Sequence, residues 1–311
     1  MSKPLQPQDK PAPRPPVVGL ALGSGSARGW AHIGVIQGLE EIGVRPQVVA
    51  GTSIGALVGA VYVSGQIEAF ADWVRKLSAR DVFSLLDFTL SGALVKGQRL
   101  FGFFEEQHHN PVIESLEQRY VSVATEMKSG REIWITRGPI LAAARASCAL
   151  PGVMSPVQHE ERWMLDGGLV NPVPVSACRA LGADVVIAVN LNAQLVGAHI
   201  SRATAEAVEQ EVPAPVKAER TLWHRVADYL KSGDGQNPSF FDVVAASVNI
   251  MQDRLTRSRM AGDPPEITLV PMLEDYALMD FHRAEQAIVE GRRLVEENAA
   301  AIRAWAGLPA E

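Results

Sequence analysis

Two segments of this chain place a glycine-rich turn directly between an apolar strand and a helix. The first, GSGSARG at Gly23 to Gly29, follows VVGLAL, and the second, GTSIG at Gly51 to Gly55, follows QVVAG. VSVAT, REIWIT, DVVIAVNL and EITLVP are further strand candidates, separated by helical stretches. Strands that alternate with helices favour a parallel sheet covered on both faces. The sequence therefore predicts an α/β fold in which a central, mostly parallel sheet lies between helices.

The chain divides into three parts. Residues 1–16 hold six prolines and almost no apolar side chains, so we expect a disordered Pro-rich tail. Residues 17–195 carry the glycine segments and form the expected catalytic core. Residues 196–311 form an expected C-terminal extension packed on the same domain, beginning with a polar, flexible stretch. Helical periodicity predicts helices over 33–42, 54–64, 240–260 and 281–305.

Composition excludes several classes of protein. The net charge of −6 and the pI near 5.7 give no basic field, which argues against nucleic-acid binding. The two cysteines, Cys148 and Cys178, cannot form a disulfide framework, so we expect a reducing, cytoplasmic environment.

The uncharged run over 48–65 contains two turn-forming glycines and reads as a strand, turn and helix rather than a membrane span. A signal peptide ending after VVGLAL is disfavoured because cleavage would remove the glycine loop. The histidines show no metal-ligand grouping, so neither a metal nor a cofactor is expected.

GTSIG offers Ser53 as a nucleophile. Flanking glycines, Gly51 and Gly55, permit a sharp strand-to-helix turn that exposes the serine hydroxyl. The pattern alone also fits an ordinary tight turn, but the preceding apolar strand and the following helix favour a nucleophile.

GSGSARG fits two kinds of site. A glycine loop after a first strand can bind a dinucleotide pyrophosphate at the helix N-terminus. That motif needs an acidic residue at the end of the second strand, where this chain has Gly51 and Thr52. An oxyanion hole needs only backbone N–H groups aimed at a developing negative charge, which this loop can supply. The oxyanion reading is therefore favoured, and Arg28 can brace the loop or add positive potential.

Asp166 precedes Gly167 and Gly168 at the end of a short apolar run. An isolated DGG is more often an ordinary turn. Beside a serine nucleophile, a carboxylate held within hydrogen-bond reach and partly desolvated can accept the serine proton. A Ser-Asp dyad is thus chemically feasible.

Four blocks together resemble the patatin-like phospholipase family, in its bacterial branch related to neuropathy target esterase. They are LALGSGSARGWAHIGVI, VVAGTSIGALVGAVY, ARASCALPGVMSPV and MLDGGLVNPVPV, and DYALMDFHRAEQAIVEGRR resembles a late segment of that branch. The resemblance implies a three-layer patatin-like fold and a Ser53–Asp166 dyad. It also implies an oxyanion loop at Ser24, Gly25, Ser26 and Arg28. The family often has consecutive glycines where this chain has Ser24 and Ser26, and a serine forced to positive φ would be strained.

The resemblance further implies a serine acyl hydrolase that cleaves fatty acyl esters, with phospholipid or lysophospholipid substrates. Two alternatives stay open: a non-catalytic lipid-binding regulatory protein, and an α/β-hydrolase whose triad uses His199, His224 or His282. Peripheral contact with a membrane and the oligomeric state also stay open. The apolar segment from Phe83 to Phe104 fits either a lid or acyl-chain wall, or buried core, and core is favoured.

Overall fold

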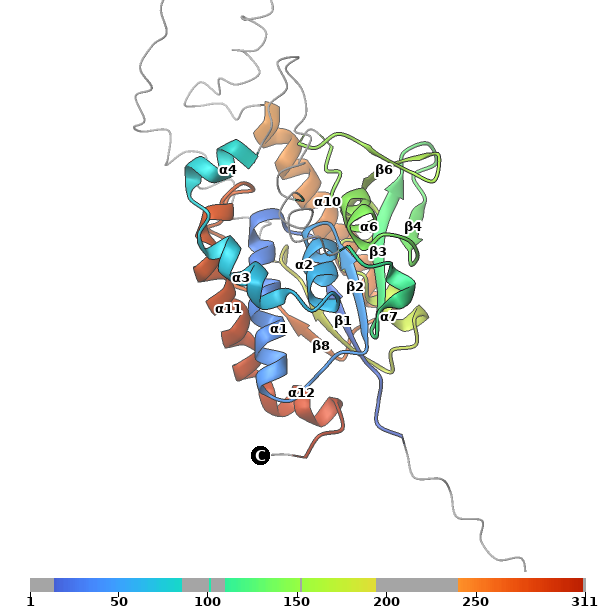
Figure 1. Cartoon of the computed structure of the whole chain (residues 1–311), viewed down its shortest axis with the longest axis vertical. Helices are drawn as coiled ribbons and strands as arrows, with labels where there is room; N and C mark the ends of the chain where they lie inside the picture. The colour runs from blue at the N-terminus through green and yellow to red at the C-terminus, as the bar shows by residue number, and fades with distance from the viewer. Residues whose placement is uncertain (1–13, 86–100, 102–109, 152, 194–239, 310–311) are drawn as a thin grey trace, which may run out of the picture.

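The computed structural model describes residues 14–85, 101, 110–151, 153–193 and 240–309, and it has an eight-stranded sheet at its centre. The strand order is β5-β6-β3-β2-β1-β7-β8, and β4 pairs with β3 beside this path. Helices cover both faces of the sheet (Figure 1). The predicted three-layer α/β fold is therefore confirmed. The strands are β1 (Val18–Leu22), β2 (Val48–Thr52), β3 (Arg119–Glu126), β4 (Glu132–Ile135), β5 (Val157–His159), β6 (Arg162–Asp166), β7 (Val185–Val189) and β8 (Ile267–Leu269).

Helices alternate with these strands along most of the described chain. The α-helices are α1 (Ala31–Glu41), α2 (Ile54–Val63), α3 (Ile67–Arg75), α4 (Ala79–Leu85), α6 (Ile140–Ser147), α7 (Val175–Ala180), α10 (Phe240–Gly262), α11 (Ala284–Glu297) and α12 (Ala299–Trp305). Short 3₁₀ turns are η1 (Ser26–Trp30), η2 (Ile113–Ser115), η3 (Gly167–Leu169) and η4 (Phe281–Arg283). The helix expected over 281–305 is thus divided, because the chain leaves helical geometry at Asn298.

The middle of the sheet is parallel and buried on both faces. β1 pairs in parallel with β2 and β7, and every residue of these three strands is buried. Their runs of Val, Ile, Leu and Ala are the composition that a strand covered on both sides requires. β2–β3 and β7–β8 extend the parallel part. The sheet therefore brings the carboxyl ends of β1 and β2 to the same edge.

One side of the sheet is antiparallel, which the sequence did not indicate. β3 pairs antiparallel with both β4 and β6, and β5 closes a hairpin with β6. β5 has only three residues, and its hairpin turns through Glu160 and Glu161, which both have positive φ. A short strand without a glycine turn gives no recognisable hairpin signal.

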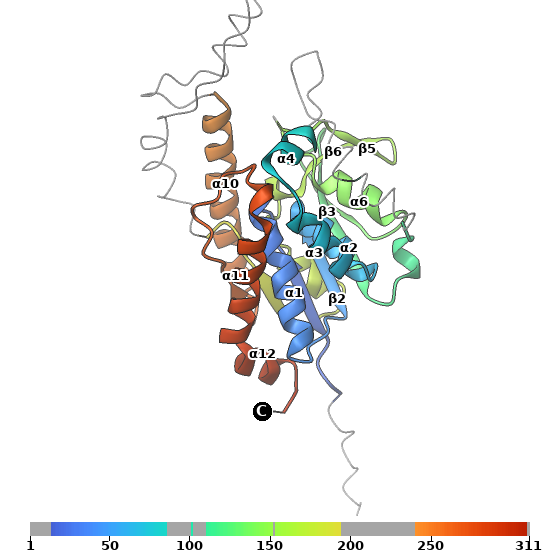
Figure 2. The same ribbon diagram turned by 60° about the vertical axis from the view of Figure 1, so that its left-hand side comes forward.

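The two faces of the sheet hold two separate apolar clusters. The larger lies beneath α1, α2, α3, α6, α11 and α12, and the smaller lies beneath α7 and the end of α10. Figure 2 shows α1 and α11 side by side. α1 and α11 approach closely through glycines. A Cβ at Gly34 would lie 1.8 Å from the Ile288 carbonyl oxygen, and one at Gly291 would lie 2.0 Å from that of Ala31.

Several predictions lie outside the described residues. They concern most of the tail, most of the 83–104 segment, and the stretch after 195 up to α10. Phe101 is described and is buried in the larger cluster. The expected boundary between core and extension therefore stays a prediction, although β8 and α11 lie within the same sheet and cluster as the first half of the chain.

Candidate active site

Ser53 lies on the sharp turn between β2 and α2. Its backbone has φ 56° and ψ −126°, outside the regions that L-residues normally occupy. Such a conformation costs about 1–3 kcal/mol and persists only where the surroundings hold it. Gly55 allows the turn, since a Cβ there would lie 2.2 Å from the Leu22 carbonyl oxygen. The hydroxyl is thereby presented at the carboxyl end of the parallel strands.

Asp166 ends β6, where Ala124 of β3 pairs with it. Ser53 Oγ donates a hydrogen bond to Asp166 Oδ2 at 2.5 Å, and Gly168 N–H donates to Oδ1 at 2.7 Å. Thr125 Oγ1 donates to the Asp166 carbonyl at 2.8 Å. Each carboxylate oxygen is thus held by one donor, and one of those donors is the half-buried hydroxyl of the turn.

Asp166 is almost fully buried, with 1% of its surface exposed. Burial raises the pKa of its carboxyl to about 6, and the hydrogen bonds from Ser53 and Gly168 oppose that rise. At pH 7 the carboxylate is therefore mostly ionised yet more basic than an exposed aspartate. A base with a pKa near the working pH is suited to proton transfer.

The loop after β1 lies against this pair. Ser24 N–H donates to the Pro172 carbonyl at 2.8 Å, whereas Gly25 N–H and Ser26 N–H meet no acceptor among the described residues. Ser26 has φ 50°, the strained backbone expected for a serine here, and its Oγ donates to the Leu278 carbonyl at 2.6 Å. Ala27 N–H donates to the same carbonyl. The loop thus has two unused N–H groups and is clamped by a distant segment.

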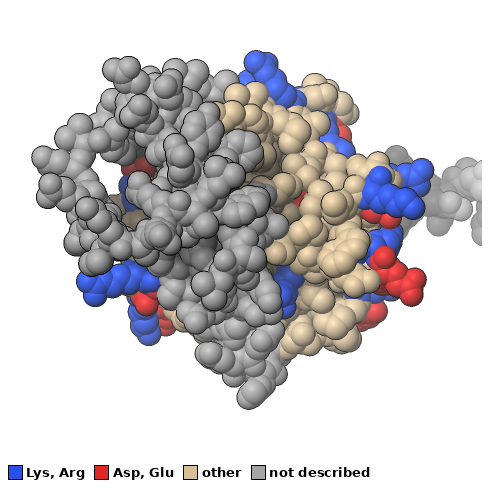
Figure 3. Space-filling view, turned by 90° about the horizontal axis from the view of Figure 1, so that it is seen from above, with Lys and Arg blue, Asp and Glu red and all other residues tan. Residues whose placement is uncertain are grey.

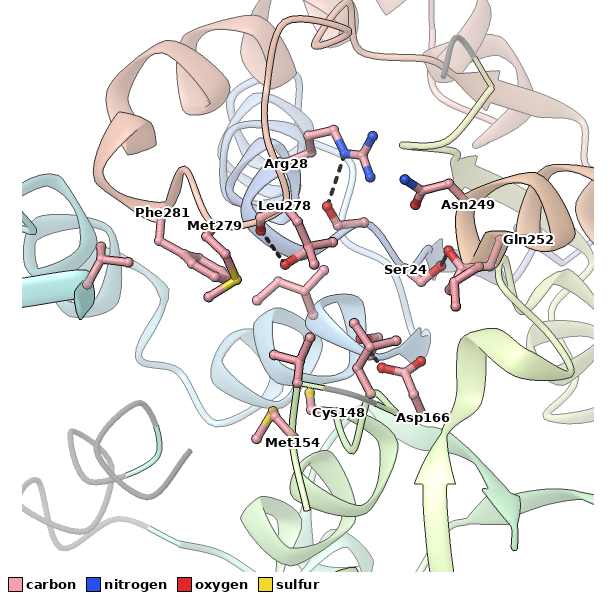
Figure 4. Close-up of a pocket in the computed structure, with 18 residues that line it drawn as sticks. Ser24, Arg28, Cys148, Met154, Asp166, Asn249, Gln252, Leu278, Met279 and Phe281 are labelled. Atoms are coloured by element: carbon pink, nitrogen blue, oxygen red, sulfur yellow. Dashed lines mark hydrogen bonds between the residues drawn. The ribbon is translucent and has the colours of Figure 1, made fainter. Parts of the chain in front are cut away.

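Arg28 is buried and braces the loop from behind. Its Nε donates to the Gly25 carbonyl at 3.1 Å and its Nη2 to Asn192 Oδ1 at 3.2 Å. Figure 4 shows its guanidinium on the far side of the pocket from Asp166. Within the described ranges no carboxylate pairs with it, and burial lowers its pKa to about 10, so it stays charged at neutral pH.

The motif glycines are required by close contacts rather than by positive φ. A Cβ added at any of them would lie 2.0 to 2.6 Å from the nearest atom, and at Gly25 and Gly29 that atom belongs to an apolar side chain. The set is Gly23, Gly25, Gly29, Gly51, Gly55, Gly167 and Gly168.

A pocket of about 900 Å³, including its open mouth, surrounds Ser53 and Asp166. Its polar side holds the loop together with Asn249 and Gln252 of α10, and Ser24 Oγ donates to Gln252 Oε1 at 3.1 Å. Its other side is apolar and includes Met154, Met279 and Phe281 (Figure 4). The pocket is therefore mostly apolar, and its few polar groups are gathered near the loop, α10 and Asp166. Further apolar lining residues are Ile54, Val82, Leu150, Val153, Val248 and Leu278.

Some of these lining residues were missed by sequence reasoning. Asn249 and Gln252 lie one helical turn apart, and buried amides on a helix are the signal that could have drawn attention to them. Leu278 acts through its carbonyl, which no sequence pattern identifies. Ser147 reaches the Ser53 backbone and was noticed only as part of a resembling block.

The histidines contribute no group to the dyad within the described residues. His282 is exposed on η4, and His199 and His224 lie outside the described ranges. His32 is buried behind the loop, with Nε2 2.8 Å from the Gly23 carbonyl oxygen. In the part of the chain that the structure describes, no three His, Cys, Asp or Glu side chains gather as metal ligands would.

Comparison with known proteins adds to this geometry. A sequence model described as "Patatin-like phospholipase" matches residues 20–179. An NTE family protein of Mycobacterium bovis, named as uncharacterised, is 32% identical over 91% of both chains. A lysophospholipase NTE1 of Pyricularia oryzae is 28% identical over 94% of this chain and 19% of its own length. VipD of Legionella pneumophila gives a TM-score of 0.38 at 11% identity, over 94% of this chain and 79% of its own, too low to carry an argument.

Proposed function

Because this chain belongs to the patatin-like phospholipase family, we propose that it is a serine acyl hydrolase that uses Ser53 and Asp166 to cleave fatty acyl esters of phospholipids or lysophospholipids. The family supports lipid acyl hydrolysis in general. The observation that carries the proposed dyad is the 2.5 Å hydrogen bond from Ser53 Oγ to a buried carboxylate at the wall of a mostly apolar pocket.

The proposed reaction passes through an acyl-serine. The Asp166 carboxylate takes the Ser53 proton as Oγ attacks the ester carbonyl carbon. The tetrahedral intermediate then collapses, and the leaving alcohol takes the proton from Asp166. Water enters, gives a proton to Asp166 and attacks the acyl carbon. Ser53 Oγ leaves with that proton, so the fatty acid is released and the enzyme is restored.

The proposed oxyanion donors are the N–H groups of Gly25 and Ser26. Arg28 Nε holds the Gly25 carbonyl, and in a trans peptide the next N–H points the opposite way. Ser26 N–H is therefore directed away from Arg28, whose guanidinium lies across the pocket from Asp166 (Figure 4). Donors fixed before the reaction stabilise the developing charge without reorganisation. In this proposal Ser24 and Arg28 support the hole instead of donating to the oxyanion.

The lining of the pocket suits a substrate with a long apolar part and a small polar part. An acyl chain would fit the part lined by Met154, Met279 and Phe281, and a polar head group would fit the part near Asn249 and Gln252. The name lysophospholipase carried by a relative agrees with such a substrate.

The end of the molecule above α4 and β6 supports contact with lipid. Seen from that end, the described surface beside the grey residues is mostly uncharged, and acidic and basic side chains gather towards its outer edge (Figure 3). Trp163 lies on β6, and Met127 directly follows β3 and donates its N–H to the Trp163 carbonyl. Each of these two side chains is more than half exposed. None of the described helices has the length and apolarity that crossing a bilayer requires. We propose peripheral contact through this end.

Turnover of p-nitrophenyl butyrate, compared between wild type and variants, tests the dyad. Ser53→Ala and Asp166→Asn should each lower kcat by at least about 10³-fold, because each removes a group that acts on the reacting atoms. Ser64→Ala, at the other end of α2, is the control and should keep wild-type activity. Equal activity in wild type and Ser53→Ala would rule out the nucleophile. If wild type and all variants bind lysophospholipid but none of them hydrolyses an ester, the non-catalytic alternative would be favoured.

A further inference from the structure

Ser147 is a fully buried residue at the end of α6, and its hydroxyl reaches the main chain of the nucleophile. Ser53 N–H donates to Ser147 Oγ at 2.7 Å, and the Ser147 hydroxyl donates its own proton to the Val123 carbonyl. A serine hydroxyl has one proton and two lone pairs. Since the proton is used on Val123, a lone pair is left to face Ser53, and the orientation of the hydroxyl is fixed.

The backbone of Ser53 depends on such a partner. Its N–H belongs to the orphan donors at the beginning of α2, which have no acceptor within the helix. Among the described residues, Ser147 Oγ is the acceptor recorded for it. Rotation about the N–Cα bond of Ser53 from φ 56° towards an ordinary value would change the direction of Oγ relative to this N–H, so the contacts with Ser147 and Asp166 could not both be kept. The hydrogen bond therefore opposes the relaxation that the strained backbone favours.

Both halves of the dyad are attached to β3 through hydroxyl groups. Val123 receives the Ser147 hydroxyl, and its neighbour Ala124 pairs with Asp166 in the sheet. Thr125 Oγ1 donates to the Asp166 carbonyl. The position of Ser53 relative to Asp166 is thus set over three consecutive residues of one strand.

We infer that Ser147 is a positioning residue, which holds the Ser53 backbone in its strained conformation so that Oγ stays on Asp166. The inference rests on the proposed function for its catalytic consequence. Ser147 does not touch the reacting atoms and is also unavailable as an oxyanion donor, because its proton lies on Val123.

Ser122→Ala is a matched control for Ser147→Ala. Ser122 is also fully buried, and its Oγ donates to the Ala143 carbonyl at 2.8 Å, linking the same two elements, β3 and α6. Both variants lose a buried hydroxyl between α6 and β3, but only one loses a contact with Ser53. With p-nitrophenyl butyrate, Ser147→Ala should lower kcat about 10- to 100-fold with KM within about twofold, as expected for a misplaced nucleophile. Ser122→Ala should keep kcat within about threefold.

The pH profile gives a readout that general destabilisation does not move. The Ser53 hydrogen bond lowers the pKa of Asp166 against the effect of burial. When Ser53 turns away, that effect is lost and the pKa of Asp166 rises further. The acidic limb of kcat/KM should therefore move to higher pH in Ser147→Ala and stay in place in Ser122→Ala.

The outcomes separate the inference from the proposed function. If wild type is active and Ser53→Ala is not, equal kcat and equal pH profiles in Ser147→Ala and Ser122→Ala overturn the inference alone. If Ser147→Ala does not fold, Ser147→Cys replaces it, since sulfur is a weak acceptor of similar shape; wild-type kcat in Ser147→Cys overturns the inference. If wild type shows no turnover, the proposed function fails, and a crystal structure of the folded Ser147 variant then tests the positioning role. Ser53 still at positive φ in that structure would contradict the inference, and Ser53 at an ordinary φ would support it.

Discussion

At the scale of single residues, Asp166 and His32 are buried groups whose pKa values move in opposite directions. Burial raises the pKa of Asp166 to about 6 and lowers that of His32 to about 4. Between pH 4 and 6 the folded state keeps a proton on Asp166 that the unfolded state has released. Over the same range the unfolded state holds a proton on His32 that the folded state excludes. Their effects on the free energy of unfolding therefore largely cancel in the wild type.

Asp166→Asn should expose the His32 contribution. Above pH 6 the variant should be more stable than wild type by up to about 2 kcal/mol, because a desolvated carboxylate is removed. As the pH falls from 6 towards 4, the stability of the variant relative to wild type should fall by about 1.4 kcal/mol per pH unit, so the advantage should be lost before pH 4. Urea unfolding of both proteins across this range measures the difference. His32→Gln should show the opposite slope, and parallel curves for all three proteins would contradict both pKa shifts.

At the scale of elements, α1 and α11 touch backbone to backbone. Gly34→Ala and Gly291→Ala would each place a methyl group where a carbonyl oxygen of the other helix lies. We expect each to lower the free energy of unfolding by about 1–3 kcal/mol, although alanine favours a helix by about 1 kcal/mol.

Gly262→Ala, at the end of α10, is the control for these two variants. Nothing lies within 4 Å of a Cβ built there, so its stability should equal or slightly exceed that of wild type. Midpoints of chemical denaturation compare the three. A stabilised Gly34→Ala would mean that the helices can separate without loss of packing.

Elements also show what the sequence could predict. The parallel strands were recognisable because their buried runs are long and apolar, and their glycine turns placed Ser53 and the oxyanion loop at one edge. The pairing of β3 with β6 could not be recognised from the sequence, since short strands with mixed polarity show little periodicity. The contacts of Gln252 and Leu278 with the loop were also out of reach, because they join residues more than 200 positions apart. The catalytic roles of Ser53, Asp166 and the loop stay predictions until activity is measured.

At the scale of the whole molecule, the site is completed by residues beyond the first two-thirds of the chain. Gln252 and Leu278 hold the loop that carries the proposed oxyanion donors, β8 covers the edge of β7, and α11 covers α1. A chain that ends after Ala193 should therefore lose both cooperative melting and ester hydrolysis. Circular dichroism and p-nitrophenyl butyrate turnover test this. A soluble, active fragment would show that residues 17–195 form an independent core.

The clamp on the Leu278 carbonyl also orders events during translation. Ser26 leaves the ribosome 252 residues before its acceptor. At ordinary elongation rates of 5–20 residues per second, that interval is roughly 10 to 50 s. In the later part of that interval a nascent chain already carries Ser53 and Asp166, while the loop around Ser26 still lacks its clamp on Leu278. On the proposed chemistry, we expect little ester hydrolysis from a nascent chain until Leu278 has emerged and clamped the loop, which protects nearby membranes from shorter translation products.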